Sequence, residues 1–237
     1  MRNAADFTLE VGQRGGTLTL PMDEEPHTYN PIHIDDAYSG IVISYIHEGL
    51  TGISWPDNEI EPALAESWTH SADGRTWTFN LRRGVKWHDG QDFNADDIVF
   101  TYQHFHGEDI NKIDDYTVEI ILPYPHVDPH FHRDYEEHLT TPILPGYILE
   151  PTLVFDEEGN FYDLPEGFWD AHPDPSDPST ADVIRTGPFK YHSHIHGESI
   201  TLARNDDYWL RDADGNRLPS LGAIVPGRHC LSLLYSS

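Results

Sequence analysis

Histidines form two groups whose spacing could hold a metal ion. His192, His194 and His196 alternate along one segment, and residues 125–132 hold three histidines and an aspartate. On a strand, residues two apart lie roughly 6.5 Å apart, so two imidazoles could share one ion. Residues 125–132 fit no standard ligand spacing, and a solvated polar face accounts for the alternating three. We therefore expect no metal at either group.

Carboxylates are the other abundant group, with 41 Asp and Glu in 237 residues. Hydrolysis by paired acids needs a fixed separation and one raised pKa, and no spacing here indicates such a pair. Neither Gly-x-Ser-x-Gly nor His-Glu-x-x-His occurs. A secreted acidic hydrolase is therefore a disfavoured alternative, and a metal-scavenging surface protein would rest on the histidines alone. We expect no catalytic residues and no cofactor.

The clearest local structure lies around residues 76–81. Trp77, Phe79 and Leu81 alternate with polar residues, which predicts a strand with one buried face. Asp-Gly at residues 73–74 is typical of a hairpin turn. Residues 66–71 are therefore expected to pair with this strand.

Similar signals predict the elements on either side. Asn94 can cap a helix, with Asp97 three residues on, where a carboxylate meets unpaired N–H groups. A hairpin is expected from Phe189, with Phe189, Tyr191 and Ile195 on one face and Lys190 and the alternating histidines on the other. The other expected elements are strands at 17–22 and 116–122, helices at 35–49 and near 147–150, and a surface loop at 156–182. Together these elements indicate a mixed α/β fold.

Several of these segments resemble a known family. The matching stretches are PALAESW at 62–68, Asp-Gly at 73–74, WTFNLRRGVKWHDG at 77–90, FNADDIV at 93–99, TGPFK at 186–190 and NDDYW at 205–209. In order and spacing they are similar to the signature of the dipeptide-, oligopeptide- and nickel-binding class, family 5, of extracytoplasmic solute-binding proteins that serve ABC importers.

The resemblance implies the first lobe of a type II periplasmic-binding-protein-like fold. In that arrangement residues 1–50 and 139–225 build a discontinuous, incomplete first lobe, and residues 51–138 an inserted α+β subdomain. The second lobe is expected to be absent. Residues 226–237 contain no acid and the only cysteine, so we expect an aberrant or out-of-frame tail.

The resemblance also places the loop after the first strand on the ligand cleft. By composition alone it would be an acidic surface loop, although loops at strand ends commonly carry binding groups. The candidate ligand-binding residues are Met22, Asp23, Glu24, Glu25, His27, Tyr29 and Asn30.

The implied function is capture of a peptide or related small solute outside the cytoplasmic membrane, for delivery to an ABC permease. Nickel or metal complexes and oligosaccharides are alternative solutes for the same fold. Because such a solute is buried between two lobes, we expect no appreciable peptide affinity from these 237 residues alone. The implied location is periplasmic or extracytoplasmic. Membrane contact would come only through the transporter or a missing lipid anchor, since residues 1–13 carry neither an export signal nor a lipid-accepting cysteine.

Composition excludes one partner class and predicts one solution property. The net charge is −27, and the lysines are only Lys86, Lys112 and Lys190. Nucleic acid is excluded as a partner, because phosphate binding needs clustered basic residues. An acidic, lysine-poor surface resembles that of salt-adapted proteins. We therefore expect salt to stabilise the fold by screening self-repulsion.

Overall fold

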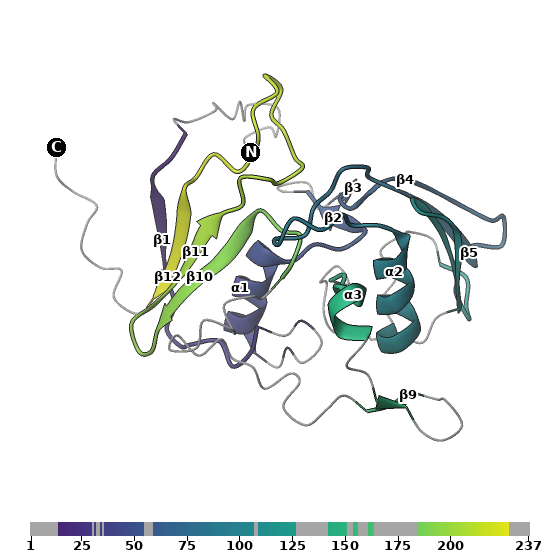
Figure 1. The fold of residues 1–237 in the computed structure, drawn as a ribbon, viewed down its shortest axis with the longest axis horizontal. Helices are drawn as coiled ribbons and strands as arrows, with labels where there is room; N and C mark the ends of the chain where they lie inside the picture. Colours follow the sequence, from purple (N-terminus) through teal and green to yellow (C-terminus); the bar gives the residue numbers. More distant parts are fainter. Residues whose placement is uncertain are drawn as a thin grey trace, which may run out of the picture.

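Two four-stranded sheets, each accompanied by a helix, make up most of the computed structural model (Figure 1). The structure describes residues 14–29, 31, 34, 36–54, 59–106, 109–126, 142–150, 154–155, 161–163 and 184–227. For residues 105–106, 154–155 and 161–163 it describes the backbone alone. No helix in these ranges is long and apolar enough to cross a membrane.

The first sheet has the order β1-β12-β11-β10. Its strands are β1 (Thr17–Pro21), β12 (Ala223–Gly227), β11 (Ser199–Arg204) and β10 (Phe189–Ile195). β1 runs parallel to β12, and the other two pairings are antiparallel. β12 continues to Gly227, so residues 226 and 227, expected in the tail, pair with the end of β1.

Helix α1 (Ala37–Ile46) lies beside this sheet (Figure 1). Its first turn is capped by Asp36, whose Oδ1 accepts a hydrogen bond of 2.8 Å from the Ser39 backbone N–H. The predicted helix at 35–49 is therefore present, within narrower bounds. The buried side chains packed between helix and sheet are Met22, Tyr29, Val42, Ile46, Phe189, Ile200, Leu202 and Ile224.

The second sheet is antiparallel throughout, with the order β4-β5-β7-β6. Its strands are β4 (Ala65–His70), β5 (Thr76–Leu81), β7 (Thr117–Ile121) and β6 (Asp109–Asp114). Trp77, Phe79 and Leu81 of β5 are at most 1% exposed, and β5 pairs with β4. The predicted hairpin and its buried aromatic face are confirmed.

Helix α2 (Ala95–Thr101) begins with the expected capping box, in which Asn94 and Asp97 exchange side-chain-to-backbone hydrogen bonds. It continues as a π-helical turn, η2 (Tyr102–His106). A short helix, α3 (Gly146–Leu149), agrees with the helix predicted near 147–150. α3 and α2 lie side by side (Figure 1).

Three features were not predicted. β6 is one, because its sequence DINKID shows no apolar alternation, which suits a polar edge strand. The pairs β2 (Thr51–Ile53) with β3 (Ile60–Pro62) and β8 (Val154–Phe155) with β9 (Phe161–Asp163) are the others. β9 lies inside the segment 156–182 expected to be a loop, and the rest of that segment is outside the described residues.

Contacts at His88 and Arg82 tie the two sheets together near the start of β10. The His88 N–H donates to the Arg185 carbonyl at 2.8 Å, and the Lys190 Nζ donates to the His88 carbonyl at 2.8 Å. Within the part that holds α1, Glu48 accepts hydrogen bonds from the Tyr208 hydroxyl at 2.7 Å and from the Trp209 indole at 3.1 Å. The Arg82 guanidinium, directly after β5, lies 4.1 Å from the centroid of the Trp209 ring and so reaches across from the second sheet. The sheet with α1 is therefore held to the sheet with α2 by polar contacts.

Candidate functional site

A β-bulge in β10 changes which histidine faces inward. Tyr191 pairs with Leu202, but Ser193 pairs with the next residue, Thr201, so His192 is an extra residue in the strand. An extra residue reverses the alternation of every side chain beyond it. His194 consequently pairs opposite buried Ile200.

The prediction for the far half of this strand is therefore wrong. His194, expected on the solvated face, is only 5% exposed, whereas Ile195, expected on the core face, is 53% exposed. His192 and His196 are exposed, as expected. His194 thus points toward the core side of the hairpin, whereas His192 remains in solvent.

The loop after β1, residues 22–29, runs alongside this hairpin and is anchored by α1. The His27 N–H donates to Asp36 Oδ2 at 3.2 Å and the Thr28 N–H to Ser39 Oγ at 3.0 Å. Of the predicted ligand-binding residues, Met22 and Tyr29 are buried, Glu25 is half-buried, and Asp23, Glu24 and His27 are exposed. Asn30 lies outside the described residues.

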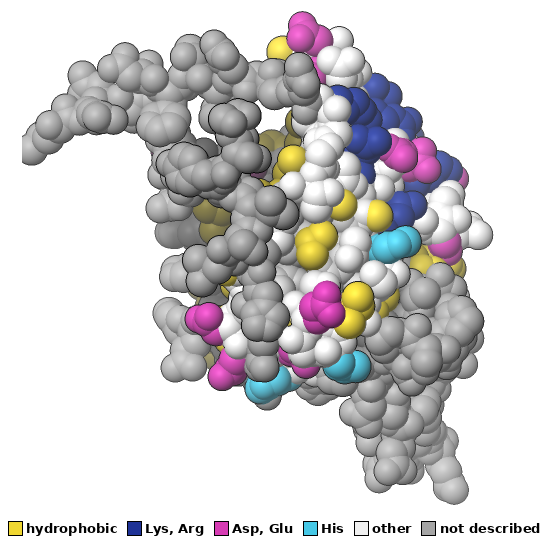
Figure 2. All heavy atoms as spheres, turned by 90° about the vertical axis from the view of Figure 1, so that its left-hand side faces the viewer, with side chains coloured by type: hydrophobic (Ala, Val, Ile, Leu, Met, Phe, Trp, Pro, Cys, Tyr) yellow, Lys and Arg dark blue, Asp and Glu magenta, His cyan; other side chains and the backbone are white. Residues whose placement is uncertain are grey.

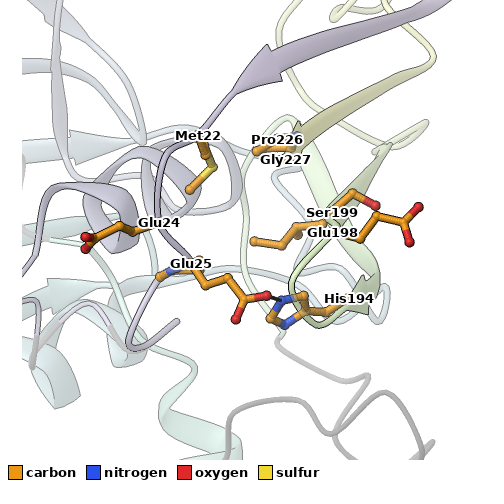
Figure 3. Close-up of a pocket in the computed structure, with 10 residues that line it drawn as sticks. Met22, Glu24, Glu25, His194, Glu198, Ser199, Pro226 and Gly227 are labelled. Atoms are coloured by element: carbon orange, nitrogen blue, oxygen red, sulfur yellow. Dashed lines mark hydrogen bonds and ion pairs between the residues drawn. The ribbon is translucent and has the colours of Figure 1, made fainter. Parts of the chain in front are cut away.

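Glu25 joins the loop to the hairpin. Its Oε1 accepts a hydrogen bond from His194 Nε2 at 3.1 Å and another from the backbone N–H of Gly197, and its Oε2 lies 3.6 Å from His196 Nδ1. Figure 3 shows the Glu25 side chain extending toward His194. The Gly197 N–H lowers the pKa of Glu25, against an opposing effect of burial and with help from His194. The carboxylate is therefore ionised at neutral pH.

Tyr29 holds the other side of the His194 ring. Its hydroxyl lies 3.3 Å from His194 Nδ1, and its ring meets Tyr191 edge-on with centroids 5.6 Å apart. Burial raises the pKa of Tyr29, so the phenol stays neutral. His194 is thus held between a carboxylate at Nε2 and a phenol at Nδ1, which fixes its orientation.

A hollow opens between this loop, the hairpin turn and the end of β12. It is shallow, with enclosed room for only about one water molecule, and is lined by Met22, Glu24, Glu25, Pro26, His194, Glu198, Ser199, Ile200, Pro226 and Gly227. We call it the loop–hairpin hollow. The Glu24 and Glu198 carboxylates point away from it on opposite sides (Figure 3). Its floor is apolar and its rim carries carboxylates.

The structure brings together only part of the predicted site. Met22, Glu24 and Glu25 line the hollow, and Tyr29 touches it through His194. Asp23 and His27 are not among the lining residues. The contributions of the hairpin and of β12 were missed, although the alternating histidines had marked the hairpin as chemically unusual.

The surface around β1 is not uniformly acidic. Figure 2, which views the molecule from the left-hand side of Figure 1, shows Lys and Arg side chains gathered near the top, with histidines below them. The basic side chains near β11 and β12 include Arg204 and Arg217, which pair with Asp206 and Asp207 at 2.7 and 3.2 Å. Among the residues that the structure describes, His194 is the one basic side chain that lines the hollow.

Comparison with known proteins identifies the family of this chain. Residues 59–225 match the family described as bacterial extracellular solute-binding proteins, family 5 Middle. The dipeptide-binding protein of Escherichia coli K12 is 29% identical over 237 residues, covering 86% of this chain and 40% of that protein. The chain therefore spans about 40% of the length of such a curated relative.

Solved structures of solute-binding proteins have a similar fold. The oligopeptide-binding protein AppA from Bacillus subtilis, in complex with a nonapeptide, is 28% identical with a TM-score of 0.68, over 91% of this chain and 40% of that one. The periplasmic binding protein MelB from Agrobacterium fabrum, in complex with stachyose, is 27% identical with a TM-score of 0.69, over 92% and 35%. With the family match extending over most of its length, the chain belongs to the bacterial extracellular solute-binding proteins of family 5.

Proposed function

We propose that this chain supplies one wall of the solute site in the binding component of an ABC importer that captures peptides outside the cytoplasmic membrane. The observation that carries the proposal is the loop–hairpin hollow, built where Glu25 fastens the loop after β1 to the bulged hairpin, in a chain of this family. Its partner would be the permease of the importer. Relatives named for dipeptide and oligopeptide binding favour peptides as the solute.

The two sheets support a division of labour. We assign the sheet β1-β12-β11-β10 with α1 to the first lobe and the sheet β4-β5-β7-β6 with α2 to an inserted subdomain. The hollow belongs entirely to the first of these. The inserted subdomain would then act as a buttress, held to the first lobe by the His88 contacts with Arg185 and Lys190 and by the Arg82 contact with Trp209.

The rim chemistry suits a ligand rich in hydrogen-bond donors. Met22 and Ile200 offer apolar contact, and the exposed side chains of Glu24 and Glu198, which point away from the hollow in the structure, could rotate at its rim to accept from N–H or ammonium groups of a ligand. A single wall encloses little of a ligand's surface, so little binding free energy remains after the entropy of association is lost. We therefore expect this chain alone to bind peptides weakly, with a dissociation constant on the order of millimolar.

Amide NMR of the 15N-labelled chain tests this proposal. A pool of mixed-sequence short peptides is titrated first, and stachyose is titrated separately as the oligosaccharide alternative. We expect peptide-dependent shifts confined to loop 22–29, residues 194–200 and the end of β12. The Glu24→Gln variant should reduce these shifts, and Glu66→Gln, an exposed acid on β4, should leave them unchanged.

Three results decide the matter. Localised shifts with peptide support the proposal. Shifts only with stachyose would replace peptide by oligosaccharide as the solute. Shifts centred on the second sheet, or no shifts with either solute at millimolar concentration, would contradict the assignment of the hollow as a solute-binding wall.

A further inference from the structure

We propose that Glu25, His194 and His196 form a binding site for one divalent transition-metal ion, with Zn²⁺ as the best-matched cation. The proposal concerns metal alone and does not rest on peptide binding. It also revises the expectation that the alternating histidines hold no metal, which assumed a regular strand.

The ligand atoms already converge. One nitrogen of each histidine and one oxygen of Glu25 all lie within 4.8 Å of one another. His194 Nε2 is 3.1 Å from Glu25 Oε1, and His196 Nδ1 is 3.6 Å from Glu25 Oε2. In a tetrahedral site with bonds of about 2.0–2.1 Å, neighbouring ligand atoms are roughly 3.4 Å apart. Only small side-chain movements would be needed to place an ion among them.

The backbone conformation of the hairpin turn brings these ligand atoms together. Gly197, with φ of 74°, adopts a conformation that favours glycine, and the Glu198 N–H donates to the Ile195 carbonyl at 2.9 Å. The turn places His196 beside His194, with ring centroids 4.4 Å apart. The bulge at His192 gives His194 its inward direction, so both irregularities of the hairpin bring the imidazoles to Glu25.

Tyr29 supplies the outer contact that metal-bound histidines usually have. While Nε2 donates to Glu25, Nδ1 accepts from the Tyr29 hydroxyl 3.3 Å away. A metal on Nε2 would move the proton of the neutral imidazole to Nδ1, and the Tyr29 hydroxyl oxygen would then become its acceptor. Such a contact fixes the orientation of the ring. The ring is thus oriented before an ion arrives, and its tautomer changes when one binds.

The donor set selects the class of cation. Two imidazoles and one carboxylate suit zinc and its neighbours, whereas calcium and magnesium prefer oxygen ligands. His194 is buried and His196 is 69% exposed in its side chain, so the site is closed on one side and open on the other. The fourth position would face solvent at the edge of the loop–hairpin hollow and would accept water or a donor atom of a solute.

Calorimetric titration of the untagged 237-residue chain with ZnCl₂, without peptide, tests the site. We expect one site of higher affinity above the weak background of the other histidines. His196→Ala should weaken that site at least about 10-fold, since it removes a direct ligand. Tyr29→Phe should weaken it about 10- to 100-fold, as loss of an outer contact does.

His192→Ala is the matched control, because His192 is an exposed histidine on the same strand with no place in the site. It should leave the affinity unchanged, and excess CaCl₂ should not compete. Circular dichroism of each variant checks that it is folded. Equal losses from His192→Ala and His196→Ala, or no zinc site above background, would overturn the proposal. Either outcome would leave the peptide mapping untouched, so the two proposals fail separately.

Discussion

Replacing Asp97 should destabilise the protein far more than replacing its neighbour Asp96, although both are acids in the first turn of α2. Asp97 is 4% exposed and accepts three hydrogen bonds: from the Trp87 indole at 3.1 Å, the Asn94 backbone at 3.1 Å and the Gly146 backbone at 3.2 Å. It thereby connects the start of α2, the turn before it and the start of α3.

The magnitude follows from the donors left behind. Asp97→Ala leaves two buried N–H groups, those of Trp87 and Gly146, without an acceptor. Each buried donor without a partner lowers the free energy of unfolding by about 1–3 kcal/mol. Part of this is offset because a buried charge also disappears: burial raises the pKa of Asp97 to about 6, against the opposing hydrogen bonds. We therefore expect the lower half of the summed range, about 2–4 kcal/mol.

Urea unfolding at pH 7, followed by tryptophan fluorescence, measures the effect. Asp96 is 69% exposed and pairs with Lys112 Nζ at 2.8 Å, so Asp96→Ala should cost less than about 1 kcal/mol. The reasoning is refuted if Asp97→Ala unfolds within 1 kcal/mol of the unaltered chain, or if the two substitutions cost the same.

Three further perturbations have definite expected outcomes. Gly187→Ala should destabilise the protein by about 1–3 kcal/mol, because the added Cβ would lie 2.5 Å from the Ile46 carbonyl. Gly40→Ala in α1, where the added Cβ meets open space, should stabilise the protein by about 0.5–1 kcal/mol, and urea unfolding measures both changes. Burial raises the pKa of Glu48 to about 7, above its unfolded value of 4.5. The free energy of unfolding should therefore fall by at most about 3 kcal/mol as the pH rises from 4.5 through 7, and Glu48→Gln should remove this pH dependence. Added NaCl should raise the melting temperature at neutral pH because the net charge is −27, and a flat or falling curve would contradict the screening argument.

Much of the fold could be predicted because its signals are local. The alternation of Trp77, Phe79 and Leu81 and the pairing of Asn94 with Asp97 each lie within a few residues, and each element formed as expected. The strand pairing of β1 with β12 could not be derived in this way, because it joins segments about 200 residues apart. Nothing in the local sequence of either strand indicates the other as its partner.

The site shows the same limit more sharply. The sequence marks His194 and Glu25 as interesting residues, but their contact depends on one extra residue in β10. Alternation assumes an unbroken strand, so a single bulge at His192 reverses the inference for everything that follows. The residue types indicated which side chains could bind a ligand, and the β-bulge determined which of these side chains contact one another.

The bulged hairpin turns His194 toward the loop after β1, so that loop and hairpin form one site. Hydrogen–deuterium exchange at the histidine C2 protons, read by mass spectrometry, tests this directly. We expect slow exchange at buried His194 and fast exchange at exposed His192 and His196. In the Glu25→Ala variant, exchange at His194 should become faster. Equal, fast exchange at all three histidines would mean a regular strand with a solvated histidine face, and would contradict the site described above.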